Sequence, residues 1–363
     1  MIDLAAEYQL YKPQLESKII EGLEKANYIQ GKEVAIFEDH LAKFLDVKHV
    51  ISCGNGTDAL QIALMALGIK ANDQVIVPAF TYPAVIEVVC LLGATPVLVD
   101  VDDTYFQINP DLLKQAITTQ TKAIIPVHLF GQSGSMEKVL QVAQEYQIPI
   151  IEDTAQALGA KYKDKFLGTL GDIGCTSFFP TKNLSCFGDG GALFTNNDDL
   201  ARKIRMIANH GQVKKYDHEI IGVNSRLDTL QAIILNHKLT FLQENITLKQ
   251  RISQQYLKEL GDLPQIKLPK IYSNTSHSWH QFTIQVLNDK RDSFKEFLKE
   301  KGIESMIYYP KALHQQKAYT QFQVYSPIAE SLCKRVLSLP VHPLLKKEEL
   351  NLVINTIKEF FNA

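Results

Sequence analysis

The regular alternation of two residue patterns is the feature that most constrains how this chain folds. From about residue 47, short apolar runs rich in β-branched residues are each followed by a segment with helical spacing. The runs expected to be strands cover residues 47–52, 74–80, 95–100, 123–130 and 148–153. The segments expected to be helices cover 57–68, 81–93 and 135–147, and another helix begins near Asn109. Buried strands separated by such helices predict an α/β protein with a mostly parallel sheet.

A change of pattern after Arg226 indicates a second, smaller domain. Two more strands are expected near 175–180 and 191–196 and a helix over 198–208, whereas 227–260 reads as one long helical stretch, straight or kinked. The remainder predicts a strand near 278–286, a helix near 292–302 and terminal helices. At roughly 150 residues per domain, we expect a large domain over 1–240 and a small α+β domain over 241–363.

The charge balance and the cysteines narrow the class of protein. The 38 Lys and Arg residues nearly balance the 40 Asp and Glu residues, and no block of like charge occurs, which argues against general binding to nucleic acid or membrane. The five cysteines are never spaced as CxxC, so we expect neither a disulfide framework nor a zinc site. The amphipathic start shows no signal peptide, and the apolar runs are too short to span a membrane. These features predict a cytoplasmic enzyme.

Common catalytic signatures are absent from the sequence. No GxGxxG follows an expected strand, and GxxxxGK[ST], HExxH and GxSxG do not occur. The histidines show no metal-ligand spacing, so no metal is expected. Polar residues instead follow the expected strands, where open α/β sheets bind their ligands.

Residues 52–58, which read SCGNGTD, join a strand to a helix and form the first candidate site. Glycines there permit close approach of the backbone, and free N–H groups at a helix start attract an anion such as phosphate. An ordinary turn with Thr57 or Asp58 as N-cap is an equally open interpretation.

Three further residues follow strands in the same way. Tyr82 opens the next helix, either as a ring beside the sheet edge or as a packed core tyrosine. Asp153, like Glu152 before it, is a carboxylate whose burial is costly without a cationic or protonated partner, although a helix cap is the alternative, above all for Glu152. Lys182 lies between a strand that Pro180 ends and a glycine-rich stretch, and it is either solvated or an amine nucleophile with a lowered pKa.

Taken together, these parts suit pyridoxal phosphate. The helix start at residues 56–57 would hold the phosphate and Tyr82 would face the ring. Asp153 would bind the pyridinium nitrogen and Lys182 the aldehyde.

Several motifs carry a resemblance to a known family. IEDTAQALGA, TSFFPTKNLSCFGDGG and GVNSRLDTLQA, together with SCGNGTDALQIAL, ANHGQ and the C-terminal SLPVHP, cover nearly the whole chain. The sequence resembles the DegT/DnrJ/EryC1/StrS family of pyridoxal-phosphate-dependent sugar aminotransferases, which have the type I (aspartate aminotransferase) fold. It is most similar to the branch that aminates the 3-keto carbon of UDP-linked 2-acetamido uronic acids.

The resemblance implies a role for each matching residue. Lys182 would be the Schiff-base lysine and proton shuttle, Asp153 the partner of the pyridinium proton, and Tyr82 the stacking ring. The remaining cofactor residues implied are Gly56, Thr57 and Ser177 at the phosphate, Gln156 at the hydroxyl, and Asn224 at the phosphate of the neighbouring subunit in a homodimer with shared sites. Arg226 would contact the sugar or a carboxylate; a structural role remains open for it and for His210.

One departure concerns the substrate pocket. The similar branch often carries His-Tyr-Pro where this chain has Tyr308-Tyr309-Pro310, with His314 further on. In the family this pocket contacts the substrate, so a dTDP-linked 6-deoxy ketosugar, or a hexulose without the carboxylate, is a rival to the UDP-linked uronic acid.

The implied reaction moves the amino group of L-glutamate, which leaves as 2-oxoglutarate, to a nucleotide-linked ketosugar at carbon 3. The amino sugar would serve lipopolysaccharide or other glycoconjugate synthesis. A sugar dehydratase is one alternative, but related dehydratases carry histidine in place of Lys182. A non-catalytic regulator is the other.

Overall fold

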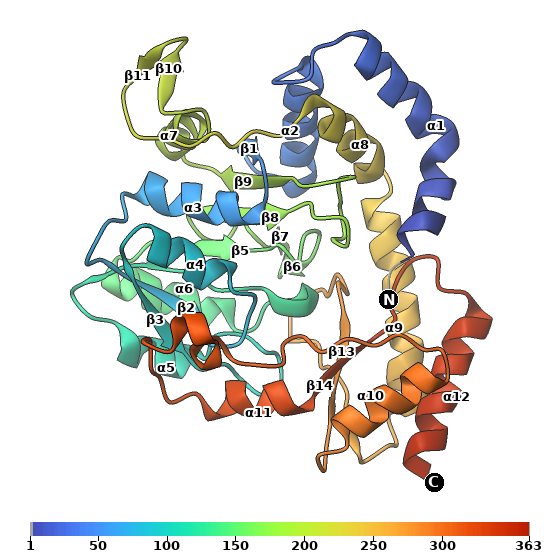
Figure 1. Ribbon diagram of the computed structural model, residues 1–363. Helices are drawn as coiled ribbons and strands as arrows, with labels where there is room; N and C mark the ends of the chain where they lie inside the picture. Colours follow the sequence, from blue (N-terminus) through green and yellow to red (C-terminus); the bar gives the residue numbers. More distant parts are fainter. Residues whose placement is uncertain (1–2, 363) are drawn as a thin grey trace.

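A central β-sheet organises the computed structural model, which describes residues 3–362 (Figure 1). Its strands are β1 (His49–Cys53), β2 (Gln74–Pro78), β3 (Thr95–Val99), β4 (Thr121–Ile124), β5 (Ile151–Asp153), β8 (Ile173–Ser177) and β9 (Gly191–Thr195). Two parts, ordered β3-β2-β4 and β1-β9-β8-β5, are joined by parallel bridges from Ile124 to Ile150 and from Val127 to Asp153. Only β9 runs antiparallel to its neighbours, which agrees with the expected mostly parallel sheet.

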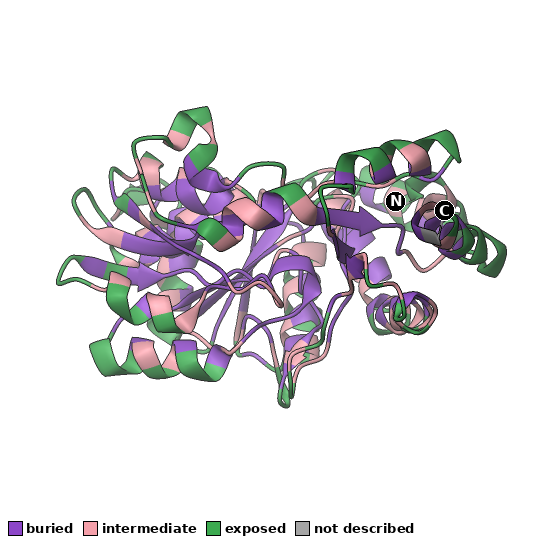
Figure 2. Ribbon diagram, turned by 90° about the horizontal axis from the view of Figure 1, so that it is seen from below, coloured by how far each residue is buried: buried purple, intermediate pink, exposed green. Residues whose placement is uncertain are grey.

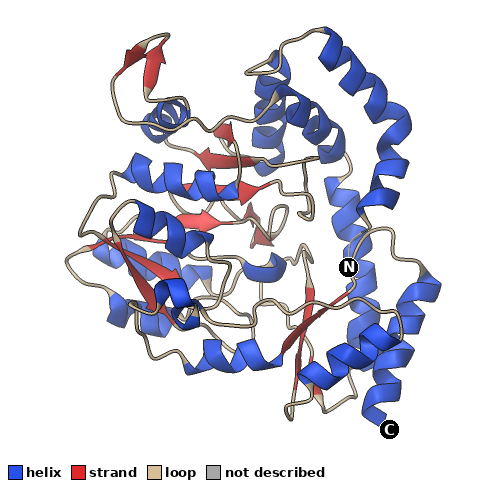
Figure 3. Cartoon of the chain, viewed as in Figure 1, coloured by secondary structure: helices blue, strands red, loops and turns tan. Residues whose placement is uncertain are grey.

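Helices cover both faces of this sheet (Figure 3). The strand residues pack alternately into cores on its two sides. The helices on one face are α3 (Gly56–Leu67), α4 (Ala84–Leu91) and α7 (Asp198–Ala208), and those on the other are α2 (Lys32–Leu45), α5 (Pro110–Ala116), α6 (Met136–Tyr146) and α8 (Thr229–Leu239). In β2, Val75 and Val77 pack on the first face and Ile76 on the second. Figure 2 shows the resulting buried strands and exposed outer helix surfaces. Burial on both faces explains the nearly continuous apolar runs in the sequence.

A second, antiparallel sheet lies in the C-terminal part of the chain. Its order is β12 (Ile266–Lys267), β13 (Phe282–Val286), β14 (Val336–Leu339), and its helices are α9 (Leu242–Leu260), α10 (Arg291–Glu300), α11 (Pro327–Arg335) and α12 (Lys347–Asn362). Helix α9 contributes Leu242 to the core beneath the central sheet and Tyr256 to the C-terminal core. The predicted division at residue 240 falls between α8 and α9 and stays a prediction.

The remaining elements extend from this body. Helix α1 (Leu4–Glu24) packs along α8, and short hairpins are formed by β6 (Lys161–Tyr162) with β7 (Lys165–Phe166) and by β10 (Gln212–Lys214) with β11 (Asp217–His218). Single 3₁₀ turns are η1 (Leu129–Gly131), η2 (Leu313–Gln315) and η3 (Lys317–Tyr319). Among residues 3–362 no helix is long and apolar enough to cross a membrane.

The structure confirms the helix expected over 198–208 and corrects several other expectations. The long stretch over 227–260 is two helices, because the chain bends at Thr240, whose hydroxyl donates a 2.7 Å hydrogen bond back to the carbonyl of His237. Strand β8 ends at Ser177, three residues before Pro180. Helix α4 begins at Ala84, so Tyr82 precedes it in a loop.

The close contact between β8 and the loop before it yields a stability prediction. A Cβ on Gly174 would lie 2.2 Å from the carbonyl oxygen of Gly168 and 2.5 Å from Cδ2 of Phe194. We expect Gly174→Ala to lower the free energy of unfolding by about 1–3 kcal/mol because the core is overpacked. Gly261→Ala, at a helical backbone position with φ −61°, is the control and should change it by less than about 1 kcal/mol in urea titrations. Equal stability of the two variants would contradict this packing.

Candidate functional site

The parallel pairing of β5 and β8 brings polar residues to one edge of the sheet. Asp153, the last residue of β5, lies opposite Cys175 of β8, which ends two residues later at Ser177. The following loop is closed by hydrogen bonds from the N–H of Phe178 to Gly190 and from the N–H of Cys186 to Phe178, both 2.7 Å. This closed loop carries Lys182.

Lys182 has the properties of an amine nucleophile. Burial lowers the pKa of its ammonium from the ordinary value to about 8, while the nearby charge of Asp153 acts in the opposite direction. Its neighbour Asn183 fixes the loop, since Asn183 accepts a 2.8 Å hydrogen bond from Nζ of Lys249 and donates a 3.2 Å bond to the carbonyl of Ser278. The uncharged amine is the form of lysine that attacks a carbonyl carbon, and a pKa of about 8 makes this form accessible near neutral pH.

Asp153 is a buried carboxylate facing this lysine. Burial raises the pKa of its carboxyl group, and the N–H of Ala155, 2.9 Å from Oδ1, together with the charges of Lys182 and His128 opposes that rise. The cationic partner that the sequence required for a buried carboxylate is therefore present. Such an aspartate can hold the proton of a ring nitrogen.

Gln156 and Tyr309 meet beside Asp153. Gln156 accepts a 2.8 Å hydrogen bond from the N–H of Phe130 and donates a 3.0 Å bond to the hydroxyl of Tyr309. Burial raises the pKa of Tyr309, whose ring centroid lies 6.2 Å from that of Tyr82. Tyr82 is 57% exposed, so the core interpretation of this residue is wrong and its ring is available to a ligand.

The expected phosphate cradle lies at the start of α3. Asn55, not Thr57 or Asp58, is the N-cap: its side chain accepts from the N–H of Asp58 at 2.8 Å. The carbonyl of Asn55 takes the N–H of Ala59, which leaves the first N–H groups of the helix, those of Gly56 and Thr57, without an intrahelical partner.

Ser177 forms the opposite wall of this cradle. A Cβ on Gly56 would lie only 2.7 Å from Cβ of Ser177, so glycine is needed for the two segments to meet. The hydroxyl oxygen of Ser177 accepts the N–H of Phe179 at 3.3 Å, and its own hydrogen is free to be donated. Backbone N–H groups, a hydroxyl and a helix N-terminus fit a phosphate group.

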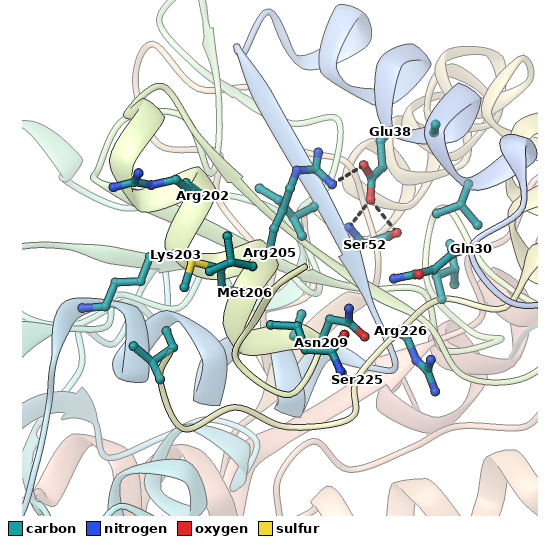
Figure 4. Close-up of a pocket in the computed structure, with 18 of the residues that line it drawn as sticks. Gln30, Glu38, Ser52, Arg202, Lys203, Arg205, Met206, Asn209, Ser225 and Arg226 are labelled. Carbon is teal, nitrogen blue, oxygen red and sulfur yellow. Dashed lines mark hydrogen bonds and ion pairs between the residues drawn. The ribbon is translucent and has the colours of Figure 1, made fainter. Parts of the chain in front are cut away.

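Asn224 and Arg226 flank a serine that ties their loop to the back of the cradle. Ser225 accepts the N–H of Gly54 at 2.9 Å and donates to Asp58 at 2.6 Å. Asn224 is exposed, and Arg226 lines a separate cavity of about 780 Å³ (Figure 4). This cavity is also lined by Glu38 and Arg205, and neither Lys182 nor Asn224 is among its lining residues.

The other two predicted substrate residues, Tyr308 and His314, have different surroundings. Tyr308 is partly buried, with its ring centroid 5.9 Å from that of Tyr309. His314 is buried, and its Nε2 lies 3.0 Å from a carboxylate oxygen of Glu330 in α11, an arrangement that suits structural support. His210 is the other residue for which the sequence left a structural role open. Its backbone carbonyl oxygen lies 2.8 Å from Nδ1 of His218.

Sequence reasoning missed two buried groups at this edge, His128 and Lys249. Glu152, which the sequence left open between a buried carboxylate with a partner and a helix cap, is fully buried and lies 2.8 Å from Nε2 of His128. Lys249 of α9 is buried, which lowers its pKa to about 8. His128 is a polar residue inside the apolar run 123–130, and that signal could have identified it; Lys249 lies in a helix with no such signal.

The sequence is similar to known sugar aminotransferases over nearly its whole length. It is 45% identical to UDP-2-acetamido-2-deoxy-3-oxo-D-glucuronate aminotransferase of Pseudomonas aeruginosa over 97% of both chains. It is 42% identical to UDP-N-acetyl-3-dehydro-alpha-D-glucosamine 3-aminotransferase of Acidithiobacillus ferrooxidans, covering 99% of this chain and 96% of that protein.

Solved structures of related proteins have the same fold as this chain. Streptomyces venezuelae DesV in complex with a ketimine intermediate has a TM-score of 0.97 and 37% identity, with 99% of this chain and 98% of that chain covered. NtdA of Bacillus subtilis, solved with the cofactor PMP, has a TM-score of 0.91 and 31% identity, with 96% and 81% covered. The fold is thus the type I pyridoxal-phosphate fold, and the protein depends on that cofactor.

The family model of these enzymes matches residues 11–358. The chain therefore belongs to the DegT/DnrJ/EryC1/StrS aminotransferase family.

Proposed function

We propose that this protein transfers the amino group of L-glutamate to carbon 3 of a UDP-linked 2-acetamido 3-keto sugar in the cytoplasm. The observation that carries the proposal is the joint position of Lys182, Asp153 and the phosphate cradle at one sheet edge. Two relatives named for UDP-linked 3-keto sugars support the substrate class. The product would enter lipopolysaccharide or another glycoconjugate.

The residues present fit pyridoxal phosphate, which supplies an electron sink and a carrier for the amino group when it is bound. Gly56, Thr57 and Ser177 would hold its phosphate, and Asp153 its ring nitrogen. Tyr82 would cover one face of the ring, and the amide of Gln156 would face the ring hydroxyl.

Lys182 would carry the protons of the reaction. As a free amine it takes a proton from the carbon next to the donor nitrogen, and as an ammonium it returns a proton to the acceptor carbon. Its pKa of about 8, lowered by burial, keeps both forms accessible near neutral pH. The carboxylate of Asp153 would hold the proton of the ring nitrogen.

The pKa of Lys182 predicts how cofactor-free protein reacts with added pyridoxal phosphate. The ordinary value of 10.5 is lowered to about 8, so the reactive amine is lost as pH falls below 8 and gained as pH rises through it. We expect the observed rate of absorbance change to increase with pH with a midpoint near 8. Lys182→Ala should abolish this absorbance change and reduce amino transfer at least about 10³-fold. A fully active Lys182→Ala variant would contradict the assignment.

The sugar is the least constrained part of the proposal. Tyr308 replaces a histidine often present in the similar branch, and the two relatives differ in whether their named sugar carries a uronate carboxylate. Arg226, a planar bidentate donor, would bind a carboxylate or a diphosphate. A dTDP-linked 6-deoxy ketosugar is the second candidate, because Tyr308 is uncharged and stands where the resemblance leads us to expect a histidine.

A substrate panel separates these candidates. UDP- and dTDP-linked 3-amino sugars, with and without the uronate carboxylate, are incubated with 2-oxoglutarate, and glutamate formation is measured. We expect the highest kcat/KM for a UDP-linked 2-acetamido 3-amino sugar. Higher turnover of the dTDP-linked sugars would favour the second candidate. Water elimination in place of amino transfer would indicate a dehydratase, and protein that stays colourless with added pyridoxal phosphate would indicate a regulator.

We further propose a homodimer in which each loop with Asn224 completes the partner's site. Asn224 is exposed although the resemblance assigns it to a cofactor phosphate, which one chain alone does not explain. Exposed apolar side chains lie near this loop. Ile221, three residues before Asn224, is 87% exposed, and Ile29, which is also exposed, forms a β-bridge with Asp228. Burial of such residues against a second copy would stabilise the pair.

Mixing of inactive variants tests the shared site. Lys182→Ala and Asn224→Ala protomers, each strongly impaired alone, should regain up to about a quarter of the wild-type activity when refolded together, since half of the protomers enter hybrids and each hybrid holds one intact site. Activity of purified hybrids is measured against each parent. Absence of recovery in a confirmed hybrid would count against sharing.

A further inference from the structure

Glu152 and His128 form a buried pair directly behind the strand end that bears Asp153. Neither side chain has any exposed surface, and Nε2 of His128 lies 2.8 Å from Oε2 of Glu152. The carboxylate also accepts the N–H groups of Gly168 at 3.0 Å and of Leu170 and Gly171 at 2.7 Å each. Glu152 thus has four donors around its two oxygens.

This donor set keeps Glu152 ionised in spite of its burial. Burial alone would raise the pKa of the carboxyl group, but the hydrogen bond and charge of His128 and the N–H groups of Gly168 and Gly171 hold that pKa below its ordinary value. Three backbone N–H groups come from one short loop, so the carboxylate shapes the loop as well as the strand. An ion this well bonded fixes the position of every group that bonds to it.

The pair is connected to Asp153 through the main chain. The N–H of His128 donates to the carbonyl of Asp153 at 2.9 Å, and the N–H of Asp153 donates to the carbonyl of Pro126 at 3.0 Å. Because consecutive strand residues point to opposite faces, anchoring Glu152 on one face directs the Asp153 carboxylate to the other.

His128 is therefore held at both ends. Its backbone pairs with Asp153 and its ring with Glu152, while Nδ1 has no hydrogen-bond partner within residues 3–362. The only described hydrogen bond of the ring is the one to Glu152, so that bond decides where the ring lies. Its loss would release the ring, and Glu152 would keep only its three backbone N–H donors, those of Gly168, Leu170 and Gly171.

We propose that His128 and Glu152 are positioning residues that hold Asp153 in register for the ring nitrogen of the cofactor. The hydrogen bond between them acts on cofactor binding through Asp153, without touching cofactor or substrate. This inference rests on the cofactor assignment and not on the identity of the sugar.

Paired variants of His128 test the proposal. His128→Gln places an amide N–H near the position of Nε2 and retains a donor for Glu152, whereas the shorter His128→Asn does not reach it. We expect His128→Asn to weaken the binding of pyridoxal phosphate by about 10- to 100-fold, measured by fluorescence titration of cofactor-free protein. His128→Gln should stay within about threefold of wild type.

The absorbance spectrum of the bound cofactor is the second readout, because it reports protonation of the ring nitrogen. It should change in His128→Asn and remain close to wild type in His128→Gln. His237→Leu, which removes another buried histidine, one in edge-to-face contact with Tyr11 and Phe241 and with no described bond to Glu152 or Asp153, controls for a general loss of stability. It should lower the melting temperature without changing affinity or spectrum.

Three results would overturn the proposal. They are wild-type affinity and spectrum in His128→Asn, equal losses in the Asn and Gln variants, and equal losses in His128→Asn and His237→Leu. If His128→Asn does not fold, His128→Gln decides alone, since a tenfold loss of affinity despite the retained donor contradicts the proposal. Wild-type protein that binds pyridoxal phosphate but aminates none of the sugars would leave this inference standing and remove the proposed function.

Discussion

The parallel pairing of β5 with β8 is the constraint on which the site depends. It places the carboxyl ends of two adjacent strands at the same edge, so that Asp153 and the Lys182 loop face each other although 28 residues of chain separate them in sequence. The pairing is tight because Gly174 lets the carbonyl of Gly168 approach β8 closely. The same loop supplies three donors to Glu152. The loop that packs against Gly174 is therefore the same loop that holds the carboxylate of Glu152 in place.

Two buried lysines near this edge illustrate how position decides chemistry. Burial lowers the pKa of both Lys182 and Lys249 to about 8, so loss of charge alone does not distinguish them. The charge of Asp153 acts on the pKa of Lys182, whereas Nζ of Lys249 donates a hydrogen bond to the side chain of Asn183. Lys249 thus supports the loop, and Lys182 is left to react.

Much of this arrangement was predictable from sequence, because apolar periodicity and strand-end polar residues are local signals. The α/β sheet, the helix at Asp198–Ala208 and the family followed from such patterns. The N-cap at Asn55 was missed because Ser, Thr, Asp and Asn occur together in SCGNGTD, and only geometry selects among them. The sequence left Glu152 open between a buried carboxylate and a helix cap, because its four donors come from His128 and from a loop that lies beyond it in sequence. The role that we propose for Asn224 in a partner's site rests on the family resemblance, because neither of these local patterns carries information about a second subunit.

The central claim is that Lys182 is the amine that binds the cofactor covalently. Borohydride reduction of the protein loaded with pyridoxal phosphate, followed by peptide mass mapping, tests it most directly. The account predicts one pyridoxyl-phosphate group per chain, attached to Lys182. Modification of Lys249 or another lysine in its place, or no stable modification, would contradict it.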